Sequence, residues 1–515
     1  MNTYSQEITC RPGVVVHPLR RISEKHIHML HSASMEILNN PGVLCFNEEA
    51  VSIFDKAGCL TTRSESDNAW IVKVPEKVIK EAIAAAPSQV LLGASEPTNK
   101  LLLDAQIPRI YFGSGSETNI FLETDIHDFK SISNPEIILR HPVYKQERGT
   151  LARLCDSARL CNNLSNVDFF IRNVNVQDEE ITENNKDVNV FMASLLYLSK
   201  HVQAGLTSLD SLDSVVRIGE IVAGDKEAFK SNTLLSFIAC VVKSPLQIVD
   251  DTAQKVIEIA RRGLPIVISS SPQGGTTAPI QEEGIVSLIN AEILSGITLT
   301  QLVNPGTPVL YGAVPVRARL DNLHDLYGTP EFIHYNTDCA QMARFYNIPC
   351  YSTAGVGDSK IPGIQATVEK LFSQLAVAQS GAQYIHYAFG LLDKTNIFSP
   401  VQAIMDDASI ALVKQIVRKP AFDNQQVEEV LDEIRKVMVS HTRLFARYIR
   451  KQMRRGIVTP PYALEGEKDY DSVIVRAHDK LEQIRTESDT CLSKDTINEL
   501  YNKIPGLLVR EKFLL

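Results

Sequence analysis

Eight apolar runs of strand length recur between residues 110 and 388, and each is followed by a helical pattern. The runs are continuously apolar rather than alternating, which indicates strands covered on both faces, as in a parallel sheet flanked by helices. Eight strand–helix units in one stretch predict a (β/α)8 barrel, the TIM barrel. The predicted strands are residues 110–113, 168–172, 202–206, 235–242, 265–269, 309–312, 350–353 and 384–388.

A doubly wound parallel sheet is the alternative architecture for alternating strands and helices. Such sheets carry a Gly-x-Gly-x-x-Gly motif after their first strand when they bind a dinucleotide. The segment Gly113–Glu117 has the first two glycines but not the third. The sequence therefore favours the barrel.

The segments on either side of the barrel have different patterns. Helical periodicity at 24–38, 47–57 and 76–86, with strand-like runs at 70–74 and 90–93, predicts a small helical and hairpin cap. Long helical patterns follow the barrel at 408–418, 427–455, 470–486 and 494–502. We expect an N-terminal cap at 1–105, a catalytic barrel at 106–405 and a C-terminal helical region at 406–515.

Net charge and apolar pattern exclude several classes of protein. The chain has 515 residues and a net charge of −9, so the basic surface that binds a phosphate backbone is not expected. No run of about eighteen apolar residues occurs, so no membrane span is expected. The first residues lack a basic stretch followed by an apolar one, which argues against secretion. We expect a cytoplasmic protein.

The nine cysteines are scattered and include no Cys-x-x-Cys pair. This usage indicates reduced thiols rather than a disulfide framework or a zinc site. Cys240 and Cys350 lie inside apolar strands, so we expect both to be packed in the core. No His-x-x-x-His motif or carboxylate triad is present, and no metal site is predicted.

A basic helical face is the exception to the acidic balance. It consists of Arg443, Arg447, Arg450, Lys451, Arg454 and Arg455. Such a face is a solvated surface or a docking face for an acidic partner protein.

Candidate site residues follow from the barrel, whose active site lies at the carboxyl ends of its strands. Aromatic rings there suit a quaternary ammonium, which is attracted to ring faces and cannot donate hydrogen bonds. An arginine would bind a carboxylate at the other end of such a ligand. The alternatives are barrel filling for the aromatic residues and a solvated loop for Arg317. The candidate substrate-binding residues are Phe112, Glu117, Arg172, Arg317, Tyr351, His386 and Tyr387.

The stretch 349–362 is the clearest passage from a strand into a functional loop. An apolar run ends at two glycines, Gly355 and Gly357, which permit close approach of the backbone. Val356 lies between them, and Asp358 and Lys360 follow before a helical pattern resumes.

Four segments carry a resemblance to a known family. They are MEILNNPGV at 35–43, NAEILSGITLTQL at 290–302, GTPE at 328–331, and the Asp358-Ser359-Lys360 motif after a strand-end Ala-Gly. From about residue 20 to its C-terminus the chain resembles the trimethylamine methyltransferase family. The resemblance implies a (β/α)8 barrel that moves a methyl group from an amine to the cobalt of a separate corrinoid protein. It implies no cofactor bound directly, because the cobalamin belongs to the partner.

The resemblance includes one departure. Founding members carry pyrrolysine in the glycine-flanked segment before Asp-x-Lys, whereas this chain has Gly355, Val356, Gly357 and Asp358 there. Family members without pyrrolysine and with a known activity demethylate quaternary amines such as glycine betaine, proline betaine and carnitine. A tertiary amine needs activation before it can leave, whereas a quaternary nitrogen already carries its charge and leaves as a neutral tertiary amine.

The sequence therefore predicts a methyltransferase acting on a quaternary amine, with Tyr351, Tyr387, Phe112 and Glu117 around the cation. Arg317 or Arg172 would bind a carboxylate, and the loop Gly355–Asp358 would line the floor. We expect a corrinoid protein as partner and a homo-oligomer. The alternatives are another methyl donor or acceptor, and a betaine-binding barrel without catalytic activity.

Overall fold

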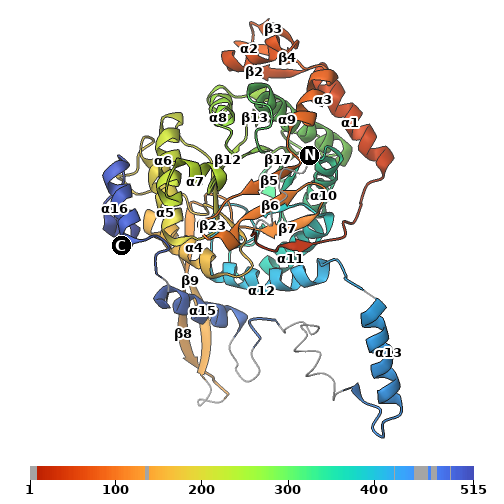
Figure 1. Ribbon diagram of the computed structural model, residues 1–515. Coiled ribbons are helices and arrows are strands. Elements are labelled where there is room, and N and C mark those ends of the chain that lie inside the picture. Colours follow the sequence, from red (N-terminus) through yellow and green to blue (C-terminus); the bar gives the residue numbers. More distant parts are fainter. Residues whose placement is uncertain are drawn as a thin grey trace.

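A curled sheet of nine strands lies at the centre of the computed structural model, which describes residues 9–133, 138–422, 424–445, 462–465, 472–487 and 489–514 (Figure 1). Each neighbouring pair in this sheet is parallel except β1 with β7. The spatial order is β1 (Val14–Val15), β7 (Arg109–Phe112), β21 (Tyr384–His386), β20 (Cys350–Thr353), β17 (Val309–Ala313), β15 (Ile266–Ser270), β12 (Leu235–Ala239), β11 (His201–Ala204) and β10 (Phe169–Ile171).

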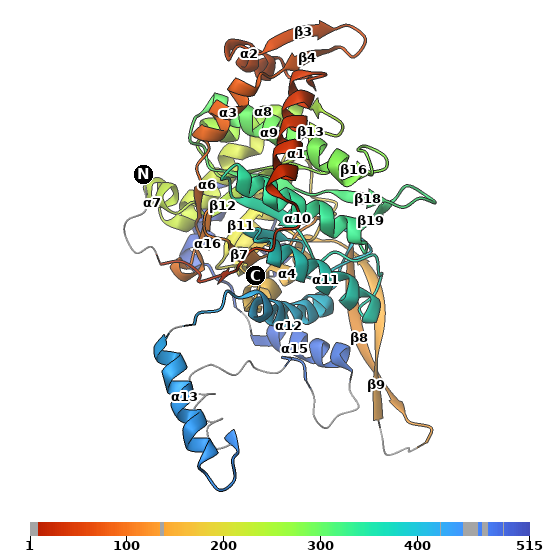
Figure 2. The ribbon, with the colours of Figure 1, turned by 90° about the vertical axis from the view of Figure 1, so that its right-hand side faces the viewer.

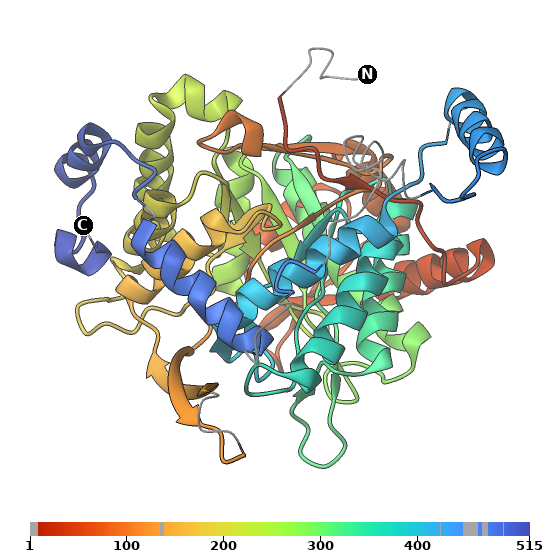
Figure 3. The ribbon, with the colours of Figure 1, turned by 90° about the horizontal axis from the view of Figure 1, so that it is seen from below.

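The eight runs predicted from the sequence are the eight parallel strands of this sheet, and the α/β class is confirmed. Helices lie around the outside of the curl when it is seen from below (Figure 3). They are α4 (Leu151–Asn163), α5 (Lys186–Tyr197), α6 (Leu212–Ala223), α7 (Lys226–Ser231), α8 (Asp250–Arg261), α9 (Glu282–Val303), α10 (Pro330–Phe345), α11 (Ile364–Ser380) and α12 (Pro400–Val417).

Helix α9 is the one helix in the described ranges that is long and apolar enough to cross a membrane. Its apolar window is 94% buried within the protein, and it contacts α1, α3, α8 and α10. This burial is typical of a core helix.

The first strand–helix unit differs from the prediction. A long hairpin, β8 (Ile120–Lys130) with β9 (Ile138–Arg148), stands between β7 and α4 and projects from the body (Figure 2). Its outer half is largely polar and exposed, so it lacks the apolar run that marks a buried strand. Shorter strands also follow the sheet strands: β13 (Val242–Lys243), β14 (Gln247–Ile248), β16 (Gln273–Gly274), β18 (Val316–Ala318), β19 (Asp325–Leu326), β22 (Leu391–Leu392) and β23 (Ile397–Phe398).

The N-terminal part contains the predicted helices and hairpins. Its β5–β6 hairpin packs four apolar residues, at 90, 92, 101 and 103, against Tyr111, Phe169 and Tyr384 inside the curl. The amino ends of the central strands are covered in this way. The elements are α1 (Glu24–Asn39), β2 (Val43–Cys45), α2 (Glu48–Lys56), β3 (Leu60–Ser64), β4 (Ala69–Lys73), α3 (Glu76–Ala85), β5 (Gln89–Leu92), η1 (Pro97–Asn99) and β6 (Leu101–Asp104).

The C-terminal part is helical as predicted, with one helix shorter than expected. Helix α13 (Asn424–Met438) ends well before the predicted residue 455, and 439–444 are not helical. It lies apart from the body in all three ribbon views (Figures 1 to 3). Apart from Arg443, the basic face lies outside the described residues. The remaining elements are η2 (Leu209–Ser211), α15 (Val473–Glu487), α16 (Lys494–Lys503) and η4 (Arg510–Phe513).

The two ends of the eight-stranded parallel row, β7 and β10, meet at a single isolated parallel bridge between Gly113 and Phe169. Beside it, the Asp168 N–H donates to the Phe112 carbonyl (2.7 Å). The Phe112 N–H in turn donates to the Asp168 carboxylate (2.8 Å). Asp168 is 1% exposed. A carboxylate therefore supplies part of the pairing where a longer ladder is lacking.

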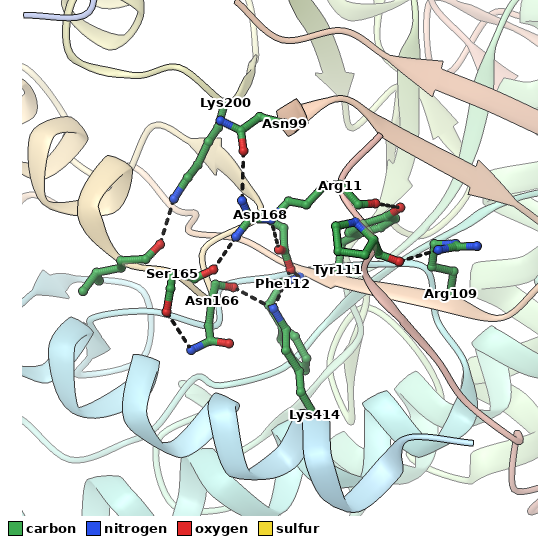
Figure 4. A network of polar contacts seen from close by, with 12 residues as sticks. Arg11, Asn99, Arg109, Tyr111, Phe112, Ser165, Asn166, Asp168, Lys200 and Lys414 are labelled. Atoms are coloured by element: carbon green, nitrogen blue, oxygen red, sulfur yellow. Dashed lines mark hydrogen bonds and ion pairs between the residues drawn. The ribbon is translucent and has the colours of Figure 1, made fainter. Parts of the chain in front are cut away.

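Two cations converge on Asp168 from distant parts of the chain (Figure 4). The Lys414 Nζ of α12 lies 2.9 Å from its carboxylate, and Arg11 of the N-terminal segment forms an ion pair with the other oxygen. Arg11 also donates to Asn99 (2.9 Å). Desolvation opposes ionisation, but Lys414, Arg11 and the Phe112 N–H together lower the pKa of Asp168.

We predict that Asp168→Ala lowers the free energy of unfolding by about 3–5 kcal/mol, because it leaves two partly buried cations and a buried N–H without their acceptor. Urea titration at neutral pH measures the loss. Because the folded-state pKa of Asp168 is lowered, its stabilisation is complete at neutral pH and is lost as the pH falls through that pKa. The gap between wild type and variant should therefore close in acid.

Lys77→Ala serves as the control, since Lys77 forms an exposed pair with Glu81. An Asp168→Ala protein as stable as this control would contradict the role given to Asp168.

Candidate substrate site at the mouth of the sheet

The strand register fixes which side chains point into the curl. Tyr351 is paired with Tyr384, and Tyr384 with Tyr111. Thr353 is paired with His386 two residues further on. Paired residues of parallel strands share a face, and the face alternates along each strand. We call the carboxyl ends of the eight parallel strands, with the loops that follow them, the mouth.

A column of rings runs from the covered end of the curl to the mouth. Phe169 stacks on Tyr384 with centroids 3.5 Å apart, and Tyr384 lies 5.7 Å from Tyr351. Tyr351 stacks on His386 at 4.1 Å, and His386 meets Tyr387 edge to face at 3.9 Å. The structure therefore brings together three predicted residues, Tyr351, His386 and Tyr387. It adds Phe169 and Tyr384, which sequence reasoning missed.

Phe112 is not part of this column. Its neighbour Tyr111 takes the inward position on β7, so Phe112 faces the outer layer, where the Lys414 Nζ lies 5.9 Å from its ring centroid. The alternation of faces along a strand explains the difference, because the sequence does not reveal the phase of a strand buried on both sides.

His386 is an uncharged member of the column. Its Nε2 lies 2.7 Å from the Thr353 hydroxyl, and its buried Nδ1 has no hydrogen-bond partner within the described structure. Burial lowers the pKa of His386 well below its usual range, so the ring is neutral at physiological pH. A neutral ring can lie beside a cation without repelling it.

Tyr387 ends the column in a strained conformation, with φ at +66°. A Cβ at Gly115 would lie 2.5 Å from its ring, so the close approach depends on that glycine. Tyr387 is half-buried, unlike the rings below it. Such strain in a non-glycine residue is typical of a functional position. The ring is thereby presented to the mouth.

Glu117 and Arg172 form an ion pair with each other at the mouth. The Lys186 Nζ is 3.8 Å from Glu117, and the buried Asp187 is 3.8 Å from the Arg172 guanidinium. The Arg172 side chain is 7% exposed, and its Nη1 makes no hydrogen bond in the part of the chain described. Both predicted residues are therefore present at the mouth, where they largely neutralise each other.

Arg317 lies elsewhere. It forms an ion pair of 3.1 Å with Glu331 at the start of α10. Its neighbour on β18, Val316, packs with Val356 and Tyr387. Because successive residues of a strand face opposite ways, Arg317 points away from the face that meets Tyr387. The structure does not bring Arg317 together with the column.

One face of α11 holds the loop Gly355–Asp358 in place. Ser373 accepts the Gly355 N–H (3.0 Å), and Glu369 accepts the Asp358 N–H (2.7 Å). Lys370 donates to the Gly355 carbonyl and forms a buried ion pair of 3.1 Å with Asp406 of α12. The loop is therefore fixed by buried polar contacts.

The side chains of the loop are also engaged. Val356 is fully buried with Val316, Tyr327, Phe332 and Leu391. The Asp358 carboxylate accepts the N–H groups of Tyr327 (3.1 Å) and Gly328 (2.7 Å), just before α10. Desolvation raises the pKa of Asp358 despite these hydrogen bonds. The loop forms a packed, largely apolar support at the mouth.

Cys240 corrects the sequence prediction. Cys350 is buried as expected, but Cys240 is exposed, because β12 ends at Ala239 and the next residue faces the mouth. Once Tyr351 and His386 show which residues of each strand face inward, the strand register places Cys240 among them.

Over the described residues, no group of three or more His, Cys, Asp or Glu is placed to hold a metal ion.

Comparison with known proteins identifies the class to which this fold and mouth belong. Residues 5–448 match the model of the trimethylamine methyltransferase family, so the chain belongs to that family and is a methyltransferase.

Several curated proteins are similar over most of their length. The trimethylamine methyltransferase of Desulfitobacterium hafniense is 29% identical over 78% of this chain and 75% of its own. The trimethylamine methyltransferase of Methanosarcina thermophila is 28% identical over 90% and 92%. A glycine betaine methyltransferase from Desulfitobacterium hafniense is 24% identical over 90% and 91%.

We predict that Lys370→Met lowers the free energy of unfolding by about 3–5 kcal/mol, because it leaves Asp406 buried without its cation. Chemical denaturation measures the loss. The double variant Lys370→Met/Asp406→Asn removes both charges and should recover part of it. A double variant less stable than the single one would show that the charge of Asp406 is not the cause.

Proposed function

We propose that this chain transfers a methyl group from a quaternary amine, such as glycine betaine, proline betaine or carnitine, to the Co(I) of a separate corrinoid protein. Membership of the family and the names of both kinds of relative support a methylated amine as donor. One observation carries the choice of a quaternary amine. The ring column ends at the half-buried Tyr387, beside a loop in which Val356, and no pyrrolysine, packs into the apolar support.

We also propose that the curled sheet is a closed (β/α)8 barrel. The bridge between Gly113 and Phe169 and the Asp168 contacts support closure. Register followed from strand to strand around the curl, starting at Cys240, returns to residue 232, a displacement of about eight residues. That displacement matches the shear of a (β/α)8 barrel.

Methyl transfer from a quaternary amine requires the protein mainly to position the two reactants. The partner's Co(I) is a substrate that supplies the nucleophile. It displaces a neutral tertiary amine from the methyl carbon, so the enzyme needs no acid to activate the leaving group. The site must hold the cation, exclude water and present one methyl group in line. Rings and neutral polar groups suit that task.

The residue roles follow the geometry. Tyr387 would provide a ring face for the cation, and Glu117 would provide a nearby negative charge. Tyr351 is 1% exposed and stacked between Tyr384 and His386, so it would support the site from below. Arg172 is the better candidate for a substrate carboxylate, because Arg317 points to the opposite face of β18. The loop Gly355–Asp358 would support Tyr387 from below. Phe112 faces the outer layer and takes no part.

The corrinoid protein must dock over the mouth, because its cobalt has to reach the substrate methyl group. A homo-oligomer is also proposed. It is supported by an apolar outer face of α11, where Ile364, Val368 and Phe372 are 86%, 47% and 62% exposed. The mass of the protein in solution tests this proposal of a homo-oligomer. A mass equal to that of one chain would contradict it.

An anaerobic assay with reduced cobalamin tests the function directly. Trimethylamine, glycine betaine, proline betaine, carnitine and γ-butyrobetaine are supplied in turn, and methylcobalamin is measured by absorbance. We expect methyl transfer from at least one quaternary amine and none from trimethylamine. If no quaternary amine reacts, even with a corrinoid protein from the same genome, the proposal is wrong. The protein would then use a different methyl donor or bind its ligand without catalytic activity.

We predict that Tyr387→Leu raises the KM for the quaternary amine about 30-fold, since a desolvated cation–π contact contributes about 2 kcal/mol. Tyr387→Phe keeps the ring and the positive φ, so its KM should stay within a few-fold of wild type. Steady-state methyl transfer measures both values. An equal loss in the two variants would assign the effect to the hydroxyl and contradict the role of the ring.

A further inference from the structure

The mouth is open on the side formed by β11 and β12. Cys240 is exposed there, and the inward-facing Ile238 is only partly buried. Inward residues on the strands that follow, including Val267, Leu310 and Tyr351, are each 1% exposed. The interior of the curl is thus filled except near the end of β12.

The thiol of Cys240 points into this opening. Ile238 is paired with Val267 across β12 and β15, and both face inward. Two residues further along each strand, the Cys240 Sγ lies 2.9 Å from the Ser269 hydroxyl. Cys240 therefore continues the inward row instead of turning to the outer solvent.

Gly205 marks free space beside the thiol. A Cβ built at Gly205 would meet only the Ile238 carbonyl, at 3.5 Å. By contrast, a Cβ at Gly312 would lie 2.7 Å from the Ile268 carbonyl. Gly205 directly follows β11, the neighbour of β12. Because Gly205 has no side chain, space is left next to the Cys240 thiol.

Gln203 provides a second sign that a ligand binds here. It lies two residues before Gly205 on the same inward row and is fully buried. Its Oε1 is 3.4 Å from Ser236, but its Nε2 has no hydrogen-bond partner among the described residues. A buried N–H donor left unpaired is costly, so the Gln203 Nε2 calls for an acceptor on a bound molecule, such as a carboxylate, or for an ordered water.

We infer that Cys240, Ile238, Gly205 and Gln203 form one wall of the quaternary amine site, with the neutral thiol in contact with the bound amine. This inference rests on the proposed function for the class of ligand. Sulfur is polarisable and makes favourable contacts with apolar groups, so a thiol suits N-methyl groups. Protein atoms around the Cys240 thiol desolvate it and raise its pKa, although the residue is accessible from the mouth, so the thiol is uncharged and weakly nucleophilic beside a methyl donor.

The test is protection of Cys240 from methyl methanethiosulfonate, a small reagent that modifies accessible thiols by disulfide exchange. The intact protein is treated with and without each amine of the assay panel, and the modification of each cysteine is followed by peptide mass spectrometry. An amine present at about ten times its Kd should slow modification of Cys240 about tenfold, by mass action. The exposed Cys491 should not change, and the buried Cys350 should stay unmodified.

The outcomes separate this inference from the proposed function. An amine that is demethylated but gives no protection overturns the inference and leaves the function standing. An amine that protects Cys240 but is not demethylated supports the inference and counts against methyl transfer from that amine. Lack of protection by every amine overturns the inference.

Gly205→Val provides a test without a ligand, because its side chain would fill the open space. The Cys240 thiol should then be modified several-fold more slowly, and Gly205→Ala should have an intermediate effect. Thermal unfolding checks that both variants fold. If folded Gly205→Val is modified at the wild-type rate, the space beside Gly205 is not continuous with Cys240 and the inference is wrong.

Discussion

The curl of the central sheet depends on a carboxylate at its seam. β7 and β10 share one bridge, and Asp168 completes the contact by exchanging hydrogen bonds with Phe112. The same carboxylate is neutralised by Lys414 and Arg11, so α12 and the N-terminal segment are tied to the seam. Without that constraint the inward row of residues would not face one shared interior. The ring column and the opening at β12 follow from it.

The seam also explains how the first hundred residues are joined to the central sheet. The sequence predicts a separate cap at 1–105, but Arg11 reaches the seam and the β5–β6 hairpin fills the amino end of the curl. The division of the chain into domains stays a prediction. The packing makes the first hundred residues part of the core on which the mouth rests.

Sequence reasoning predicted the eight parallel strands, because continuous apolar runs such as 265–269 and 309–312 read the same way whatever their phase. For the same reason it named Phe112 as a site residue, whereas Tyr111 is the residue of this strand that faces the interior and Phe112 is buried in the outer layer. It placed Tyr351, His386 and Tyr387 near one another. Cys240 and Gly205 were missed, since their importance lies in an opening that only the register defines. The hairpin of β8 and β9 was missed because the outer half of both strands is largely polar and exposed.

The mouth is built from groups that carry little net charge. Glu117 and Arg172 pair with each other, His386 is neutral, and Val356 packs its apolar side chain into the loop beside Tyr387. The positive φ of Tyr387 lowers the stability of the fold, and together with the close approach of Gly115 it fixes the position of a single ring. This combination is suited to a ligand that brings its own positive charge and needs no proton.

The most direct test of this account compares glycine betaine with 3,3-dimethylbutanoate (tert-butylacetate), the isostere in which a neutral carbon replaces the quaternary nitrogen. Binding of both is measured by isothermal titration calorimetry on the intact protein. The two have nearly the same shape and the same carboxylate, and only the first has a positive nitrogen. If ring faces bind the cation, glycine betaine should bind at least about tenfold more tightly. Equal affinities, or tighter binding of tert-butylacetate, would show that the mouth does not recognise a quaternary ammonium.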